Sequence, residues 1–175
     1  MAFYSGDWKR AKELYSDSLR AAAPGSERET ILAAKMNVAK VTLAEGHSVP
    51  ASELRQLADQ ADALGVRDRS VEGSVYLAEG MINSKDYTHA RETLERNLGP
   101  SEKMGLRMQT AKIHYLLGTS LRLSGHSADA ASHYREFIRL LDDMKKEAGA
   151  EKLLERADLK SIYEESTRWA AAGKN

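Results

Sequence analysis

Cysteine is absent from the 175-residue sequence, and proline occurs only 3 times. Without cysteine, the chain has neither a disulfide framework nor a metal site built on thiolates. Few prolines interrupt helices, and Ala, Leu, Glu, Lys and Arg, which favour helix, are abundant. β-Branched residues are sparse and never alternate with polar ones over the length of a strand. The sequence therefore predicts an all-α protein.

Two further absences concern membranes and nucleic acids. No apolar run approaches the ~20 residues that span a bilayer, and the first residues lack the basic start and apolar core of a secretion signal. Lys plus Arg and Asp plus Glu number 26 each, so no excess charge steers the chain toward nucleic acid, and no basic stripe with stacking aromatics occurs. We expect a cytoplasmic protein that binds neither nucleic acid nor membrane.

The motifs of common catalytic and metal sites are also missing. Phosphate-binding and nucleophile-elbow patterns do not occur, and the five histidines form no H-x-x-x-H or H-E-x-x-H motif. His126 and His133 have no carboxylate at ligand spacing except Asp129. Adjacent carboxylates such as Asp142 and Asp143 point about 100° apart on a helix and cannot converge on one substrate. We predict no enzyme activity, no cofactor and no metal.

The stretch from Ala111 to Leu141 predicts a helical hairpin. Apolar residues recur at helical spacing on both sides of Gly125, which separates the two helices. Small residues, Gly118 and Ala130, occupy positions where the helices of a hairpin must approach each other closely. The rest of the chain resembles earlier or altered copies of this unit.

Matching alanines in the second helix of each hairpin give the repeat length. Ala90 and Ala130 are 40 residues apart, and Ala11 precedes Ala90 by 79, close to two further periods. The middle equivalent is expected near Ala51 or Leu54. Periodic helical hairpins indicate a solenoid. We therefore predict an α-α superhelix of about 8 helices, closed by a C-terminal capping helix.

Turn signals divide this predicted single domain, residues 1–175. Pro24 and Gly25 end the first long helix, and Ser26 with Glu29 forms a capping box that opens the next. The resulting units are a partial repeat over 1–24, repeats over about 26–65, 67–99 and 101–147, and a C-terminal cap over 150–172.

Two further predictions concern helix ends in the second half. Gly99-Pro100-Ser101 is interpreted as a stop, turn and cap, so that a helix ends near Leu98. Asp158 is interpreted as the cap of the last helix, and Trp169 is expected on the buried face of that helix.

The N-terminal end carries three aromatic residues, Phe3, Tyr4 and Trp8. No first helix precedes the helix expected over residues 6–23, so we expect the chain to start inside a repeat. The aromatics then lack the helix that would cover them. Exposed aromatics favour an end-to-end contact, giving a homodimer or docking to a missing parent domain.

The hairpin pattern resembles the tetratricopeptide repeat family over roughly residues 6 to 145. Its repeats are longer than the hallmark 34 residues, as in repeats attached to bacterial signalling kinases and regulators. This likeness implies a right-handed superhelix whose first helices line a concave groove for peptides or protein segments. The residues that carry it best are Leu117, Gly118, Leu121, Gly125, Ala130, Tyr134 and Phe137.

The resemblance also assigns candidate positions to the groove. They carry both signs of charge and one tyrosine, which suits a polar peptide partner, although polar residues are also what any solvated helix face carries. The positions are Asn37, Lys40, Glu72, Glu79, Asn83, Lys112, Tyr115, Thr119 and Arg122.

A non-enzymatic interaction module or scaffold is the function that the resemblance implies. It would bind a protein or peptide partner through the concave face, within a larger bacterial signalling or regulatory protein. Two alternatives stay open. One is an oligomerisation or structural module that pairs through its N-terminal end. The other is a small-molecule sensor domain, which a discrete apolar pocket with a few converging polar groups would favour.

Overall fold

The computed structural model describes residues 2–22 and 27–172, and within these ranges it contains helices and no strand. Eight helices are 13 to 19 residues long, which confirms the predicted all-α fold of about 8 helices. In chain order the elements are α1 (Ala2–Ser5), α2 (Trp8–Ala22), α3 (Arg28–Ala44), α4 (Ala51–Ala63), α5 (Arg67–Asn83), α6 (Tyr87–Lys103), α7 (Arg107–Leu123), α8 (Ser127–Lys145), the 3₁₀ turn η1 (Leu153–Glu155) and α9 (Ala157–Ala172).

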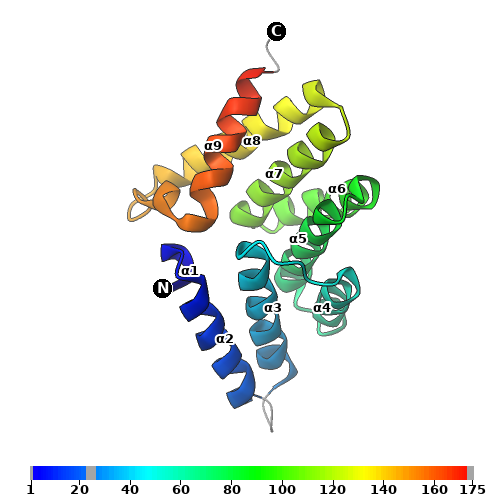
Figure 1. Ribbon diagram of the computed structural model, residues 1–175, viewed down its shortest axis with the longest axis vertical. Coiled ribbons are helices and arrows are strands. Elements are labelled where there is room, and N and C mark those ends of the chain that lie inside the picture. The colour runs from blue at the N-terminus through cyan, green and yellow to red at the C-terminus, as the bar shows by residue number, and fades with distance from the viewer. Residues whose placement is uncertain (1, 23–26, 173–175) are drawn as a thin grey trace.

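The helices pack in consecutive pairs, as a helical repeat requires (Figure 1). α3 contacts α5, and α5 contacts α7, so these three first helices form a continuous layer. α4, α6 and α8 pack against this layer. The three first helices begin at Arg28, Arg67 and Arg107, which are 39 and 40 residues apart, close to the predicted period.

Glycines follow the ends of several helices, as predicted for Gly125. Gly46, Gly65 and Gly125 adopt positive φ angles of 78°, 72° and 88°. L-residues with a Cβ rarely adopt this left-handed conformation, so glycine is the usual residue just after a helix.

The predicted stop at Pro100 is wrong. α6 continues through Pro100 to Lys103, and the chain turns at Gly105, whose φ is 67°. Gly99 has no Cβ to clash with the proline ring, which relieves the usual restriction on helical conformation before proline. Ser101, expected as a cap, is fully buried inside the helix. The boundary between these two repeats therefore lies near Gly105.

The two predicted helix caps lie at the start of α3 and at the start of α9. Pro24, Gly25 and Ser26, which carry the first stop and half of the capping box, lie outside the described residues. α9 begins at Ala157, so Asp158 falls in its first turn and not at the cap. The reason is that its carboxylate accepts hydrogen bonds from the Arg156 guanidinium.

The fourth position of each second helix is a buried contact. Ala11, Leu54, Ala90 and Ala130 occupy it and are 2%, 0%, 0% and 2% exposed, so Leu54 is the middle equivalent. The larger leucine is accommodated by Gly80 on the facing helix. A Cβ added to Gly80 would lie only 2.7 Å from Leu54 Cδ1.

A double-mutant cycle tests this compensation. Gly80→Ala alone is expected to destabilise the fold by about 1–3 kcal/mol through overpacking, and Leu54→Ala alone by about 2–5 kcal/mol through lost burial. In the Leu54→Ala background, Gly80→Ala should be neutral or stabilising, because the methyl group has room and alanine favours helix. Urea unfolding measures all four proteins. Additive effects would contradict the pairing.

The two ends of the helical array meet. α9 packs on α8 as the predicted cap, and α1 contacts α9 (Figure 1). A Cβ added to Gly6, next to α1, would lie 3.1 Å from the Ala157 Cβ. On α9 itself, Leu159 and Ser166 are fully buried, but Trp169, which was expected on the buried face, is 37% exposed. The chain thus forms a nearly closed arc.

Candidate functional site

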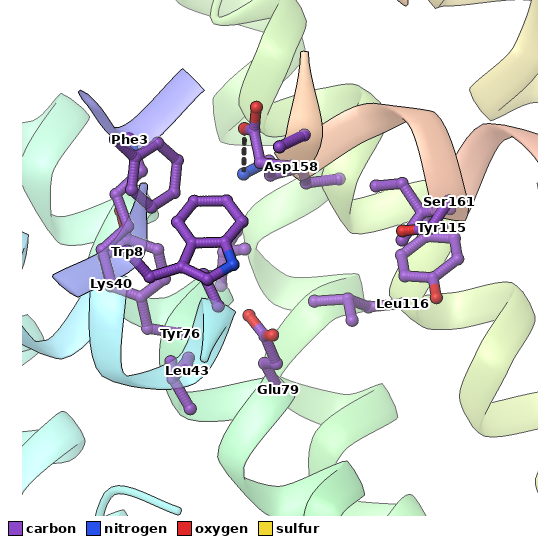
Figure 2. A pocket seen from close by; sticks show the side chains of 15 residues that line it. Phe3, Trp8, Lys40, Leu43, Tyr76, Glu79, Tyr115, Leu116, Asp158 and Ser161 are labelled. Carbon is purple, nitrogen blue, oxygen red and sulfur yellow. Dashed lines mark ion pairs between the residues drawn. The ribbon is translucent and has the colours of Figure 1, made fainter. Parts of the chain in front are cut away.

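A cavity of about 210 Å³ lies on the inner side of the arc (Figure 2). Its walls come from α1, α2, α3, α5, α7 and α9, and none of the residues that line it belongs to α4, α6 or α8. The walls are mainly apolar, with a few charged side chains among them. The charged side chains are Lys40, Glu79, Lys112 and Asp158.

The N-terminal aromatics form one wall of this cavity. Phe3 is only 5% exposed, and its ring centroid lies 5.0 Å from that of Trp8. The Lys40 ammonium lies 4.4 Å from the Phe3 centroid, and the Arg156 guanidinium lies 3.8 Å from that of Tyr4. Such cation–π contacts contribute about 0.5–2 kcal/mol each. The expectation of uncovered aromatics thus fails for Phe3, which its own chain covers, while Tyr4 is 42% exposed.

Asp158 connects α7 to the start of α9. Its carboxylate accepts hydrogen bonds of 3.0 and 2.8 Å from Arg156 and lies 3.6 Å from the Lys112 ammonium. The side chain is only 5% exposed. Burial acts to raise the pKa of Asp158, but the Arg156 hydrogen bond and the charge of Lys112 outweigh it and lower the pKa. The carboxylate is therefore held ionised between two cations.

Glu79 is different, because its carboxylate has neither a hydrogen bond nor an ion pair within residues 2–22 and 27–172. Burial raises the pKa of Glu79, and the charge of Lys112 only partly opposes this. Burial, assisted by Lys112, likewise lowers the pKa of Lys40. Figure 2 shows the Glu79 carboxylate and the Trp8 indole nitrogen directed toward the open centre of the cavity. This pocket therefore contains charged groups that its own side chains leave incompletely compensated.

A second cavity of about 280 Å³ adjoins the first, and the two share Lys40, Val75, Tyr76 and Lys112 as lining residues. Tyr76 is buried, and its hydroxyl donates a 2.6 Å hydrogen bond to Glu72, which also pairs with Arg69 at 2.7 Å. Burial and the neighbouring Glu72 raise the pKa of Tyr76. Tyr76 is thus a neutral side chain, held in place by Glu72, that lines both cavities.

The structure brings together about half of the predicted groove residues. Lys40, Glu79, Lys112 and Tyr115 line the first cavity, and Glu72 lines the second. Asn37 is half-buried on α3, and Asn83 is exposed at the end of α5; neither lines these cavities.

Tyr115 and Arg122 hold the capping helix in place. The Tyr115 hydroxyl donates to Glu165 at 2.9 Å, and Arg122 pairs with the same carboxylate at 2.8 Å. Arg122 also lies 4.8 Å from the Trp169 centroid, which explains how this partly exposed tryptophan is packed. Burial and the nearby Glu165 raise the pKa of Tyr115.

Thr119 is likewise engaged inside the protein. It is buried, and its hydroxyl lies 3.2 Å from the Tyr134 hydroxyl. Together with Tyr115 and Arg122 it therefore belongs to the contact between α7 and its neighbours.

Sequence reasoning missed the part of the pocket that α9 supplies. Asp158, Ser161 and Ile162 line the cavity, yet they lie beyond the repeat pattern, which fades after about residue 145. The only local signal was an acidic residue at the start of a helix, which has an ordinary explanation as a cap.

His133 pairs with His114, and not with His126 as considered from the sequence. His114 Nδ1 lies 3.0 Å from His133 Nδ1, whereas His126 is exposed before α8. Burial and the neighbouring His133 lower the pKa of His114 to about 4, and burial lowers that of His133. Within the described ranges, no group of three or more potential ligands is placed to hold a metal ion.

The histidine pair predicts a pH dependence of stability. The unfolded chain protonates His114 near its ordinary pKa of 6.5, whereas the folded chain resists protonation down to about 4. The unfolded state then binds more protons over this range, so stability falls as pH decreases from 6.5 toward 4. His114→Gln should flatten that part of the pH profile in urea unfolding, while exposed His126→Gln should not. If the free energy of unfolding falls equally steeply with decreasing pH in both variants, His114 is not the group responsible.

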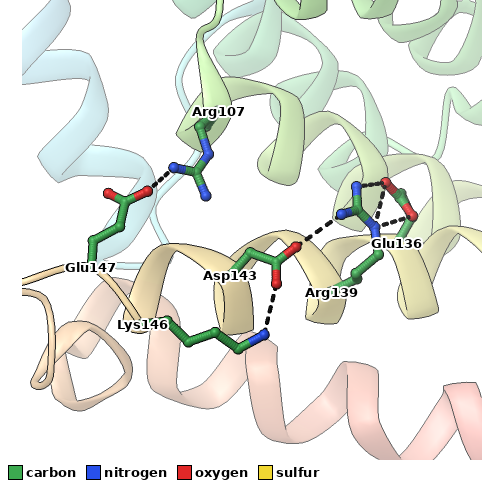
Figure 3. Close-up of polar contacts among 6 residues, drawn as sticks. All are labelled: Arg107, Glu136, Arg139, Asp143, Lys146 and Glu147. Carbon is green, nitrogen blue, oxygen red and sulfur yellow. Dashed lines mark hydrogen bonds and ion pairs between the residues drawn. The ribbon is translucent and has the colours of Figure 1, made fainter.

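The outer face of α8 carries a ladder of ion pairs (Figure 3). Arg139 pairs with Glu136 and Asp143, and Asp143 also pairs with Lys146. Asp142 accepts instead a 2.8 Å hydrogen bond from Tyr163 of α9. The adjacent carboxylates thus point to different neighbours, as the helical geometry predicts, and this face is a solvated ion-pair surface.

Comparisons of the chain with protein-family models, with curated proteins and with solved structures gave no match. The tetratricopeptide resemblance therefore stays a prediction that the sequence motifs carry. In the part of the chain that the structure describes, no helix combines the length and hydropathy needed to cross a bilayer.

Proposed function

We propose that this protein is a non-enzymatic binding module, a helical repeat of the bacterial tetratricopeptide type whose concave face receives a segment of a partner protein. The resemblance further suggests that it serves within a larger signalling or regulatory protein. One observation carries the proposal. Lys40, Glu79 and Lys112, each from a successive first helix, line one cavity.

The shape of the site limits how a partner binds. α1 and α9 meet at the inner side of the arc, and the hollow is divided into cavities of about 210 and 280 Å³. A chain end or loop tip that places one side chain in each cavity fits better than a long helix. The cavity walls carry both signs of charge, which favours a polar peptide. Helical scaffolding keeps these side chains in place and limits the entropy lost on binding.

Selection from a random-peptide library against the purified protein tests this proposal. Ser161→Trp and Gln109→Trp each place a large side chain at a lining position, one in each cavity. We expect selected peptides to bind at least about tenfold more weakly to these variants. Lys160→Trp is the matched control, since Lys160 is exposed on the same helix as Ser161 but lines neither cavity.

Peptides that bind all three variants as tightly as the native protein would contradict the proposed surface. A library that yields no binder would count against peptide recognition altogether. Circular dichroism confirms that each variant keeps its helical content, so that a loss of binding is not a loss of fold.

A small-molecule sensor is the second candidate function. The cavity of about 210 Å³, with apolar walls and a few converging charged groups, supports it. Pairing of two copies through the N-terminal end has weaker support, because Phe3 is buried within its own chain.

A further inference from the structure

The first cavity contains an uncompensated carboxylate. Glu79 lies among Leu43, Val75 and Leu116 on the cavity wall, and neither a cation nor a hydrogen-bond donor within the described residues contacts its oxygens. Glu79 is half-buried, so its carboxylate reaches the cavity, and a carboxylate without a partner in the protein is available to a ligand cation.

The same cavity contains a cation without a carboxylate partner. The Lys40 ammonium contacts the rings of Phe3 and Tyr4, and no ion pair of Lys40 occurs in the described part of the chain. Lys112, in contrast, has a carboxylate partner, because its ammonium lies 3.6 Å from Asp158. The cavity thus combines one carboxylate and one ammonium that have no ion-pair partner in the described residues, and its lining carries two groups of each sign.

This balance selects the class of ligand. A simple anion would be attracted by Lys40 but repelled by Glu79. A simple cation would be attracted by Glu79 but repelled by Lys40. A molecule with an ammonium and a carboxylate satisfies both groups at once. The volume of about 210 Å³ is below the ~300–1,000 Å³ of pockets for drug-sized ligands, so the occupant is small. The apolar walls require an apolar body between or beside its charges.

We propose that this cavity binds a small zwitterion of amino-acid size, with its ammonium at Glu79, its carboxylate at Lys40 and its apolar body against Val75 and Leu116. The inference rests on the binding role proposed for the concave face and deepens its second candidate. The Trp8 indole nitrogen, which faces the same space (Figure 2), supplies a further donor for the carboxylate.

Calorimetric titration with defined probes tests the proposal. L-Leucine and ε-aminocaproate distinguish ligands with adjacent charges from ligands with separated ones, and at least one of them should bind. Their derivatives without an ammonium, N-acetylleucine and N-acetyl-ε-aminocaproate, should bind at least about tenfold more weakly, as should leucinamide, which lacks the carboxylate. Equal binding of the parent and N-acetyl compounds, or no binding of either zwitterion in the millimolar range, would overturn the proposal.

Two variants test which side chain binds each charged group of the ligand. Glu79→Gln should weaken zwitterion binding at least about tenfold without lowering stability, because the Glu79 carboxylate makes no hydrogen bond or ion pair within the described residues. Lys40→Met should weaken it similarly and leave leucinamide binding unchanged. Glu92→Gln on α6, exposed and distant from the lining residues, is the control. Unchanged binding in Glu79→Gln would contradict the assigned role of that carboxylate.

The outcomes also separate this inference from the broader function. Failure of both zwitterions while library peptides still bind the concave face would overturn the ligand class alone. Failure of zwitterions and peptides together would remove the binding role proposed for the face.

Discussion

The ion cluster at Asp158 is the contact on which the arrangement of the inner face depends. Its carboxylate is buried between Arg156 and Lys112, and Arg156 in turn covers the ring of Tyr4. Together, Asp158 and Arg156 therefore link a first helix of the repeats, the capping helix and the N-terminal turn. Removing one partner from such a buried pair generally costs about 3–5 kcal/mol, because the remaining charge is left uncompensated.

Closure at Asp158 changes what a helical repeat offers a ligand. An open superhelix presents a long groove, whereas here α1 and α9 meet and the inner face is reduced to two small cavities. Lys40 and Glu79 keep their positions on the first helices, but they become part of an enclosed wall. The enclosure reduces their hydration, and their pKa values shift in the directions that favour the neutral forms. A preformed site of this kind binds without ordering a loop.

The repeating helical hairpins could be predicted from the sequence, but the contact between α1 and α9 that closes the arc could not. The hairpin around Gly125 was predicted correctly, since apolar periodicity and the turn glycine agree there. Pro100 misled because its effect depends on the glycine before it, and Trp169 because its packing comes from Arg122 on another helix. The contact between α1 and α9 depends on the accumulated curvature of all the intervening helices. No local pattern encodes that sum, so Asp158 was interpreted as a simple cap.

The most direct test of the closed arc is a distance between its two ends. The sequence has no cysteine, so Ser5→Cys and Lys160→Cys, both at exposed positions of α1 and α9, give two unique sites for spin labels. Pulsed electron paramagnetic resonance should give one short, narrow distance distribution, which broadens when Asp158→Asn is added. A long or broad distribution in the protein with native Asp158 would contradict the closure and the enclosed pocket that depends on it.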